Sequence, residues 1–388
     1  MSDQWSQSRI ARSDDSAASA QAPGPAPAPK AREPILGLKP YVPGKPIEEV
    51  QRELGLTGVI KLASNENPLG PSPKALEVLR GELSRVHLYP DSNDHHLKKA
   101  VAAKLGVSEE EIIIGNGSDE VMRVLGEAFL DPGDEVIIPT PSFSEYEYVA
   151  RLCGATPVFV PLCDDKMDLE AMAAAVAPRT RIVFICSPNN PTGTIITARE
   201  LDQFLDRVPD HVIVAIDEAY SDYAESSDYH YRSLDYVVRR NVIVTRTFSK
   251  IYGLAYLRLG YGVARPEITR PMRMAREPFS INGLAQVAGA AAITDEAHVE
   301  ASRRLNSEGK LFLSAGLDKL GLRPVPTEAN FILIDTGRPS LEVFEGLLRL
   351  GVIVRPAKSF GLPKHIRVTI GTPQQNARFL EALGRVLG

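Results

Sequence analysis

The chain has 388 residues, a mild net charge of −5 and a hydrophobic content of 44%, the composition of an ordinary globular protein. No strongly basic segment is present, so nucleic acid is not expected as a partner. No apolar run reaches the roughly 18 residues that a membrane span requires. The three cysteines are too few for a disulfide framework and the first residues carry no signal-peptide pattern, so we expect a cytoplasmic protein.

The order of the predicted elements divides the chain into four parts. Residues 1–33 are rich in proline and alanine and are predicted to form a disordered tail, because they bury too little apolar surface to fold. Residues 34–65 are predicted to be an N-terminal arm that joins the smaller of two domains. The larger domain is expected over residues 66–275. In residues 276–388 helices come first and strands later, which predicts a smaller α+β domain.

The larger domain is predicted to be an α/β fold with a mostly parallel sheet. Short apolar runs recur between helical stretches and are uniformly apolar, which is typical of strands covered on both faces. These runs are residues 112–114, 136–138, 182–185, 212–216 and 242–244. The strands predicted for the smaller domain are residues 330–334, 352–354 and 366–370.

A glycine-rich turn, residues 115–119, follows the first apolar run and opens a helix. Ligands of open α/β sheets bind beyond the carboxyl ends of the strands. Free N–H groups at a helix start bind anions, and phosphate is the usual one. Taken alone, the turn is explained better as an ordinary helix cap by Ser118 or Asp119, because such turns are common.

Asp217 and Lys250 follow two further apolar runs. A carboxylate at the end of a buried strand is costly unless it is paired, and a protonated pyridine nitrogen is a suitable partner. A lysine with a lowered pKa forms a Schiff base with an aldehyde cofactor. Arg258 adds a cation that can grip a phosphate through two parallel hydrogen bonds. Taken singly, Asp217 is also explained as a helix cap and Lys250 as a surface lysine.

Together these segments resemble the fold-type I aminotransferases, which use pyridoxal 5′-phosphate. The resemblance rests on Ser187-Pro-Asn-Asn-Pro-Thr-Gly193, Asp217-Glu-Ala-Tyr220, Thr247-Phe-Ser-Lys250 and Arg258. Within that family the chain is most similar to the histidinol-phosphate aminotransferases, on the segments Lys39-Pro-Tyr41, Ser64-Asn-Glu-Asn-Pro68, Leu88-Tyr-Pro90, Asn330-Phe-Ile-Leu333, Val354-Arg-Pro356 and Ile366-Arg-Val-Thr369.

The resemblance implies a role for each candidate residue. Lys250 is the Schiff-base lysine and proton shuttle, Asp217 pairs with the ring nitrogen, and Tyr220 bonds the ring oxygen. The implied cofactor-binding set is Gly117, Ser118, Asp119, Phe143, Asn190, Asp217, Tyr220, Thr247, Ser249, Lys250 and Arg258, with Tyr89 supplied by the second subunit of a homodimer. The implied substrate-binding set is Tyr41, Asn330, Arg355 and Arg367, in which Arg367 holds a carboxylate and Arg355 and Tyr41 are candidates for a phosphate. No metal site is predicted.

The reaction that the resemblance implies is amino transfer from histidinol phosphate, a phosphorylated amino alcohol, to 2-oxoglutarate in histidine biosynthesis. Two alternatives use the same motifs: transamination of aromatic amino acids, and decarboxylation of threonine phosphate. A third alternative is a cofactor-binding regulatory module. Such proteins usually carry a basic DNA-binding domain, and the N-terminal tail of this chain is not expected to be one.

One position departs from the family pattern. The family sequence Gly-Leu-Ala-Gly-Leu-Arg is replaced here by Gly253-Leu-Ala-Tyr-Leu-Arg258. A glycine usually marks a positive φ angle or a close backbone approach. We therefore expect the ring of Tyr256 to alter either cofactor geometry or substrate access.

Overall fold

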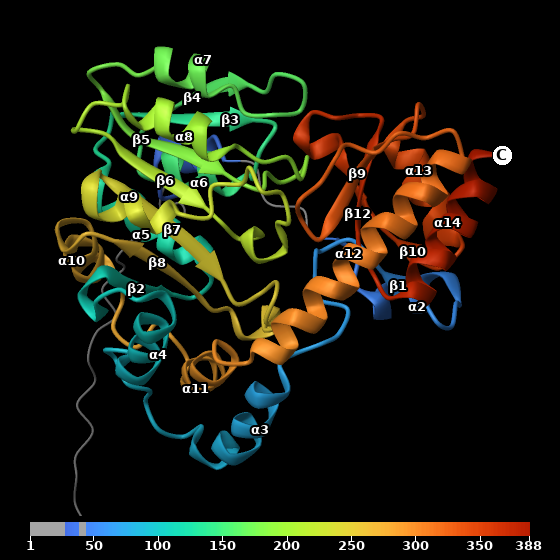
Figure 1. The fold of residues 1–388 in the computed structure, drawn as a ribbon, viewed down its shortest axis with the longest axis horizontal. Coiled ribbons are helices and arrows are strands. Elements are labelled where there is room, and N and C mark those ends of the chain that lie inside the picture. Colours follow the sequence, from blue (N-terminus) through green and yellow to red (C-terminus); the bar gives the residue numbers. More distant parts are fainter. Residues whose placement is uncertain (1–27, 39–43) are drawn as a thin grey trace, which may run out of the picture.

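A computed structural model describes residues 28–38 and 44–388. Figure 1 shows a large α/β body and a smaller body, with the long helix α12 (Glu296–Lys319) running between them. Of the predicted tail, only residues 28–33 are described. Helix α1 (Glu33–Leu36) begins there, and Arg32 donates a hydrogen bond to the Leu152 carbonyl at 3.3 Å.

The large body is built on a seven-stranded sheet in the order β2-β8-β7-β6-β5-β3-β4. Strand β8 runs antiparallel to both of its neighbours, and the other pairs are parallel, so the predicted mostly parallel α/β sheet is confirmed. The strands are β2 (Ile112–Gly115), β3 (Glu135–Thr140), β4 (Thr156–Pro161), β5 (Thr180–Cys186), β6 (Ile213–Asp217), β7 (Val242–Thr247) and β8 (Gly260–Ala264).

Two of these strands did not stand out in the sequence. Strand β4 lies at the edge of the sheet, is partly exposed and contains two prolines, so it lacks the uniform apolar run of a central strand. Strand β8 contains two glycines. An alanine-sized side chain at Gly260 would lie 2.3 Å from the backbone nitrogen of Ser118, so β8 needs glycine where it passes the start of α5.

Alternate residues of each strand enter two different cores, because successive side chains point to opposite faces of a sheet. In β6, Val214 and Ile216 belong to the core on one face, and Ile213 and Ala215 to the core on the other. The first core is covered by α4 (His95–Leu105), α7 (Leu169–Ala174), α8 (Ala198–Leu205), α9 (Ser233–Arg239) and α11 (Gly283–Ala292), and the second by α5 (Ser118–Phe129), α6 (Glu145–Leu152) and α10 (Pro266–Ala275).

The smaller body contains a three-stranded antiparallel sheet in the order β11-β12-β9 and a parallel pair, β1 with β10. Its strands are β1 (Ile60–Lys61), β9 (Phe331–Asp335), β10 (Val352–Ile353), β11 (Arg355–Pro356) and β12 (His365–Thr369). Its helices are α2 (Ile47–Leu54), α13 (Ser340–Arg349) and α14 (Pro373–Leu387). The pairing of β1 with β10 brings the segment before residue 65 onto this body.

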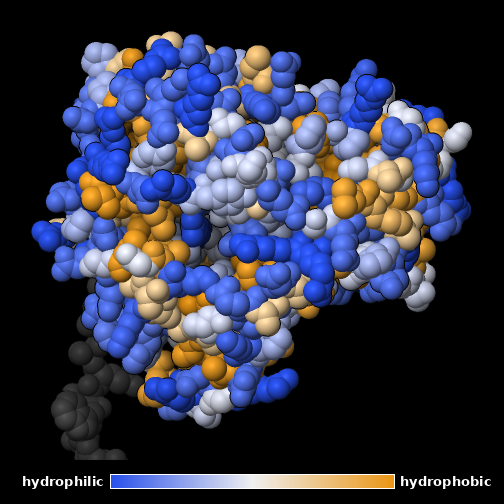
Figure 2. All heavy atoms as spheres, viewed as in Figure 1, coloured by the Kyte–Doolittle hydropathy of each residue, from blue (hydrophilic) through white to orange (hydrophobic). Residues whose placement is uncertain are grey.

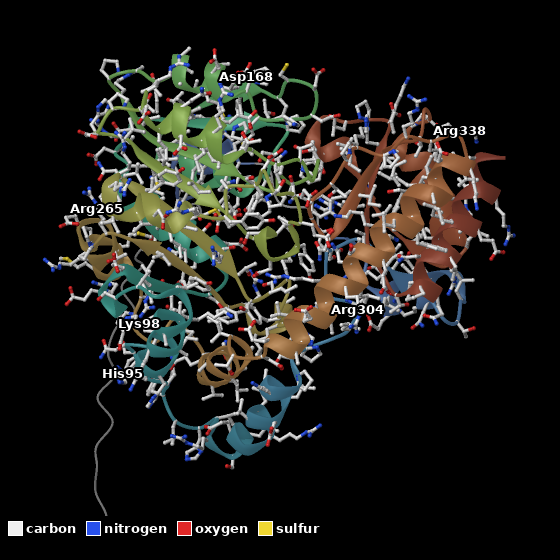
Figure 3. All side chains as sticks on the ribbon, viewed as in Figure 1. His95, Lys98, Asp168, Arg265, Arg304 and Arg338 are labelled. Atoms are coloured by element: carbon white, nitrogen blue, oxygen red, sulfur yellow. The ribbon has the colours of Figure 1, made fainter. Side chains whose placement is uncertain are left out.

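Side-chain hydrogen bonds to the backbone also occur at the outer edges of the two bodies. Asp168 caps α7 by accepting a hydrogen bond from the Ala171 N–H at 2.8 Å, and Arg338 donates to the Val386 carbonyl at 3.1 Å; Figure 3 shows them at separate edges of the molecule.

The domain boundary at residue 276 stays a prediction, and the packing of α11 and α12 bears on where it lies. Helix α11 packs against α3 (Pro73–Glu82) and α4, and its buried alanines belong to the core of the large body. Within α12, Val299 enters the large core, whereas Leu313 and Leu317 enter the core of the smaller body. We therefore propose that the change of domain falls between these positions of α12.

Across the described part of the chain, no helix is both long and apolar enough to cross a membrane.

Candidate active site

The carboxyl ends of the central strands and the start of α5 bring the predicted cofactor residues to one edge of the large sheet. Asp217 ends β6 and lies in register with Cys186 of β5 and Thr245 of β7. Lys250 follows β7 by three residues, and Asn190 follows β5 by four. This convergence arises because the carboxyl ends of parallel strands share one edge.

Asp217 is a buried carboxylate that is held by neutral donors. Its Oδ2 accepts a hydrogen bond from the Tyr146 hydroxyl at 2.7 Å, and its Oδ1 accepts from the Ala219 N–H at 3.1 Å and the Thr245 hydroxyl at 3.4 Å. Burial raises the pKa of Asp217 to about 6, against the opposing effect of these donors. The site therefore favours a cation beside Asp217, because a nearby positive charge stabilises the ionised form.

Lys250 lies in a setting that favours its neutral amine. Its Nζ donates to the Ser64 carbonyl at 3.3 Å and lies 5.6 Å from the centre of the Tyr220 ring. Burial, together with the positive charge of Arg367, lowers the pKa of Lys250 to about 8. A neutral amine is the nucleophilic form, so this lysine is suited to react with a carbonyl group.

The start of α5 and Arg258 form a cradle for an anion. Gly117 precedes the helix with a φ of 84°, and a Cβ at this position would lie 2.5 Å from Nη2 of Arg258. Arg258 pairs with Asp119 at 2.9 Å and donates to the Ser249 hydroxyl at 3.4 Å. The buried Ser118 begins the helix. Free helix N–H groups beside a guanidinium fit a phosphate group.

Thr247 is placed beside this cradle by the end of β7. Its hydroxyl donates to the Leu259 carbonyl at 3.4 Å and accepts from the Ser249 N–H at 3.1 Å. It therefore also shapes the turn that leads to Lys250.

Tyr220 is fixed by a segment that the sequence analysis did not assign to the site. The Asn65 side chain donates to the Tyr220 hydroxyl at 3.0 Å, and burial raises the pKa of that hydroxyl above its usual value. Asn330, predicted to bind substrate, is fully buried and donates to the Asn65 carbonyl at 3.0 Å. Because its amide holds the Asn65 segment, we propose that Asn330 positions that segment instead of contacting substrate.

Two arginines from adjacent strands lie opposite one another. Arg355 of β11 is in register with Arg367 of β12, and directly opposed residues of an antiparallel pair share one face of the sheet. Arg367 is buried, donates to the side-chain oxygen of Asn190 and to the Ala63 carbonyl, and lies 5.3 Å from the centre of the Phe331 ring. Two neighbouring cations favour an anionic ligand between them.

Phe143 and Tyr89 have different surroundings. Phe143 lies between β3 and α6, half-buried, with its ring edge-on to Tyr146 at 5.8 Å. Tyr89 is 84% exposed and packs on Phe279 at a ring separation of 4.9 Å. It is thus not brought among the strand-end residues of its own chain. Tyr41 lies outside the described residues.

Tyr256 does not enter the site of its own chain, so the expected effect on cofactor geometry finds no support in the structure. Its side chain is 98% exposed, on the short helix η4 (Ala255–Leu257). The left-handed backbone conformation falls instead on Arg258, whose φ is 52°. Position 256 therefore accepts a large side chain without strain.

A second buried carboxylate, Glu218, lies on the opposite face of the sheet from Asp217. Arg246 of β7 donates to it at 2.8 Å, and Nε2 of the buried His230 lies 3.4 Å from it. Although burial opposes ionisation, Arg246 lowers the pKa of Glu218 to about 2. This ion pair ties the end of β6 to the end of β7, and so supports the strands that carry Asp217 and Lys250.

The described residues contain no group of three or more His, Cys, Asp or Glu side chains arranged to hold a metal ion.

Comparison with known proteins agrees with this geometry. Residues 57–383 match the family described as aminotransferase class I and II. The histidinol-phosphate aminotransferase of Moorella thermoacetica is 58% identical over 92% of this chain and 93% of its own length. That of Symbiobacterium thermophilum is 53% identical over 92% and 98%. A solved histidinol-phosphate aminotransferase from Sinorhizobium meliloti, in complex with pyridoxal-5′-phosphate, superposes with a TM-score of 0.85 at 26% identity, covering 92% of this chain and 97% of that one.

The chain therefore belongs to the class I and II aminotransferase family and is a transaminase that uses pyridoxal 5′-phosphate. The resemblance to the histidinol-phosphate aminotransferases is confirmed by these identities. The residues of the site fit the cofactor chemically: a partly buried lysine with a lowered pKa for its aldehyde, a buried carboxylate for its ring nitrogen and the α5 cradle for its phosphate.

Replacing Arg246 by methionine should leave Glu218 buried without its cation and lower the free energy of unfolding by about 3–5 kcal/mol. In the wild type the pKa of Glu218 is about 2, whereas in the unfolded chain it is 4.5. The full contribution of Glu218 to the free energy of unfolding is therefore present above pH 4.5. In the variant that pKa rises above 4.5, so the carboxylate destabilises the fold increasingly as the pH rises. The melting-temperature gap should thus be wider at pH 8 than at pH 5.

The matched control is Arg240→Met, which removes the exposed pair with Asp206 and should cost no more than about 1 kcal/mol. A gap that is independent of pH would show that Glu218 and Arg246 do not form the proposed charge pair.

Proposed function

We propose that the enzyme transfers the amino group of histidinol phosphate to 2-oxoglutarate, as a step of histidine biosynthesis. The observation that carries the substrate assignment is the opposed pair Arg355 and Arg367, which offers two guanidinium groups to the phosphate of a substrate that lacks a carboxylate. The names of the relatives at 58% and 53% identity support the same substrate.

The chain's own groups divide the work of the reaction. When bound, the cofactor supplies an aldehyde carbon that takes up the amino group and a ring that accepts the electron pair left by the departing proton. Lys250 holds the cofactor and then carries the proton to and from the carbon that bears the amine. Asp217 keeps the ring nitrogen protonated. Tyr220 and Asn190 donate to the ring oxygen, since the Asn190 oxygen already accepts from Arg367 and leaves its NH2 group to donate.

The alternative substrates require other site contacts. An aromatic amino acid would need Arg367 alone, for its carboxylate. Threonine phosphate carries both anions, and its decarboxylation would release carbon dioxide instead of forming a keto acid. Product analysis therefore separates all three activities.

We propose that the active form is a homodimer in which Tyr89 enters the partner's site. Apolar side chains are exposed on the lower part of the large body, where α3 and α11 lie (Figure 2). In the segments next to these two helices, Leu83, Val86 and Leu88 follow α3 and Phe279 precedes α11, and all four are exposed. A second copy of the chain would cover this surface.

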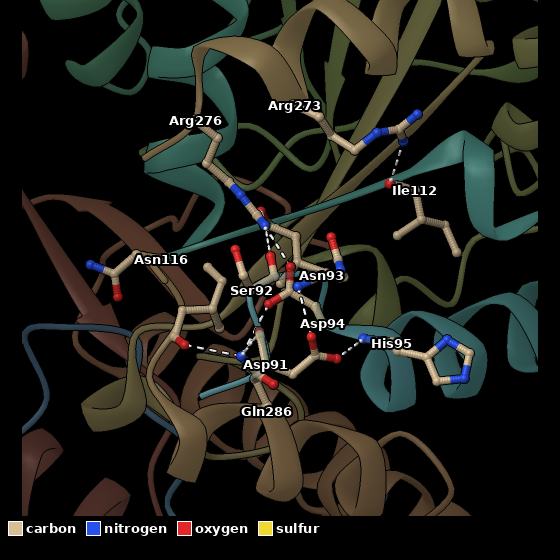
Figure 4. Close-up of polar contacts among 12 residues, drawn as sticks. Asp91, Ser92, Asn93, Asp94, His95, Ile112, Asn116, Arg273, Arg276 and Gln286 are labelled. Atoms are coloured by element: carbon tan, nitrogen blue, oxygen red, sulfur yellow. Dashed lines mark hydrogen bonds and ion pairs between the residues drawn. The ribbon is translucent and has the colours of Figure 1, made fainter. Parts of the chain in front are cut away.

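The segment after Tyr89 is firmly anchored, which supports a fixed outward direction for this side chain. Arg276 donates to the Asp94 carboxylate at 2.6 Å and to the Ser92 carbonyl at 2.9 Å, and Gln286 donates to the Asp91 carbonyl at 2.8 Å (Figure 4). Burial raises the pKa of Asp94, against the opposing charge of Arg276.

A cytoplasmic location is also proposed. It is supported by the thiols of Cys153, Cys163 and Cys186, all of which are free, as in proteins of a reducing compartment.

In Lys250→Ala, borohydride should no longer fix the cofactor to the protein. The rate of amino transfer should fall about 10²–10⁴-fold, because the proton carrier is lost. Peptide mapping of the reduced wild type should find the cofactor on Lys250. The control Lys310→Ala removes another partly buried lysine, paired with Glu225, and should keep both properties. Fixation on a different lysine would refute the assignment.

Mixing Tyr89→Ala with Lys250→Ala should restore activity, although each variant alone is inactive. In a mixed dimer one site has Lys250 from one subunit and Tyr89 from the other, so random pairing gives about one quarter of wild-type activity. Mixing Lys250→Ala with Asp217→Asn is the control, because these residues share a chain and no complete site forms. A fully active monomer by light scattering would exclude the dimer proposal.

Arg355→Ala should slow the histidinol-phosphate half-reaction about tenfold or more relative to the glutamate half-reaction, since a hydrogen bond to a charged group contributes about 1.5–3 kcal/mol. Both half-reactions are followed by single-turnover absorbance. Lys358→Ala, which removes an exposed cation three residues away, should change neither. Equal losses in the two half-reactions would assign Arg355 a structural role.

A further inference from the structure

Tyr146, the second residue of α6, is completely buried and connects two of the residues that are assigned to the cofactor ring. Its hydroxyl donates to Oδ2 of Asp217 at 2.7 Å. Its ring meets that of Phe143 edge-on at 5.8 Å and an interplanar angle of 86°. On its other side it stacks on Phe184 of β5 at 4.6 Å and 14°. The sheet therefore fixes Tyr146, and Tyr146 contacts both ring-facing residues.

The hydrogen bonds of Asp217 leave limited freedom for an added ligand. A carboxylate has about four lone-pair positions. Ala219 and Thr245 donate to Oδ1, and Tyr146 donates to Oδ2. The position that remains open is on Oδ2, the oxygen that Tyr146 holds. The direction of the Tyr146 hydroxyl thus decides where Asp217 can accept another hydrogen bond.

The local electrostatics keep Tyr146 a donor. Burial, with Asp217 beside it, raises the pKa of the Tyr146 phenol well above its usual value. Burial and Asp217 likewise raise the pKa of the neighbouring Cys186 thiol to about 12. Both groups therefore stay neutral at physiological pH, and Asp217 is the group of this cluster that ionises.

We propose that Tyr146 is a positioning residue, which sets the orientation of the Asp217 carboxylate towards the ring nitrogen and, through its edge contact, the placement of the Phe143 ring. This inference rests on the proposed roles of Asp217 and Phe143 at the cofactor. The geometry makes one side chain responsible for groups on two different segments, the end of β6 and the loop before α6.

The decisive variant is Tyr146→Phe, which keeps the ring, its stacking and its edge contact and removes only the hydroxyl. The loss of a hydrogen bond to the charged carboxylate raises the pKa of Asp217, by about one to two units. In a plot of kcat against pH, the acid limb should move to higher pH by about one unit. The affinity of the apoprotein for pyridoxal phosphate, measured by fluorescence titration at pH 6, should fall about tenfold.

The matched control is Tyr229→Phe. Tyr229 is also buried, and its hydroxyl donates to the Ser187 carbonyl at 2.8 Å without touching Asp217. It should lower the melting temperature of the apoprotein as Tyr146→Phe does, but leave the acid limb and the cofactor affinity unchanged. A purely structural role for Tyr146 would make the two variants alike in every measurement, and that result would overturn the proposal.

A second pair of variants, Tyr146→His and Tyr146→Leu, tests the same hydrogen bond independently of Tyr146→Phe. The histidine ring can still donate to Asp217 and should keep the acid limb closer to the wild type than leucine does. Identical acid limbs in the two variants would overturn the proposal.

Asp217→Asn separates this inference from the proposed function. Loss of turnover in Asp217→Asn together with an unchanged profile in Tyr146→Phe would refute the role of Tyr146 alone. Near-normal turnover in Asp217→Asn would refute the proposed role of Asp217, and with it the inference that depends on it.

Discussion

The buried carboxylate of Asp217 is the constraint on which the rest of the site depends. A charge at the end of a central strand has lost most of its hydration, and neutral donors replace only part of it, so the pKa of Asp217 lies near 6. A cation beside Asp217 stabilises the ionised carboxylate and so compensates for the rest of the lost hydration. The sheet therefore favours a cation beside Asp217 before any ligand is bound, which is the preorganisation that the proposed pairing with a protonated ring nitrogen would use.

The alternation of a β-strand explains how two adjacent carboxylates have opposite properties. Asp217 points to the face of α5 and α6, where it finds hydroxyl and N–H donors, whereas Glu218 points to the other face and pairs with Arg246. Burial raises the pKa of Asp217 to about 6. At Glu218 the positive charge of Arg246 outweighs the effect of burial, and the pKa falls to about 2. One carboxylate is thus left for a ligand while its neighbour stabilises the strands beneath it.

The substrate side of the site depends on contacts between distant segments. Asn65 follows the strand β1 of the smaller body and yet bonds Tyr220 of the large body, and Asn330 holds the Asn65 segment in place. Arg367 reaches Asn190 in the same way, from β12 to the loop after β5. Tyr220 and Asn190, which are proposed to bind the cofactor, are therefore linked by hydrogen bonds to segments of the smaller body, so the relative placement of the two bodies affects both side chains.

Local patterns in the chain were enough to predict the α/β class and five of the strands, and they singled out Lys250, Asp217 and Arg258 as cofactor-binding candidates, because uniform apolar runs and the residues that follow them are local features. These patterns did not reveal β4 or β8, because the prolines of β4 and the glycines of β8 interrupt the apolar run of a strand. A helix pattern also does not show which core the helix joins, which is why the boundary predicted at residue 276 and the one proposed inside α12 differ. Tertiary packing is what brings Tyr146 to Asp217 and Asn65 to Tyr220, and it leaves the ring of Tyr256 facing outward. These contacts join residues that lie 71 and 155 positions apart, and the direction of an exposed side chain depends on the packing around it, so no local pattern in the sequence encodes them.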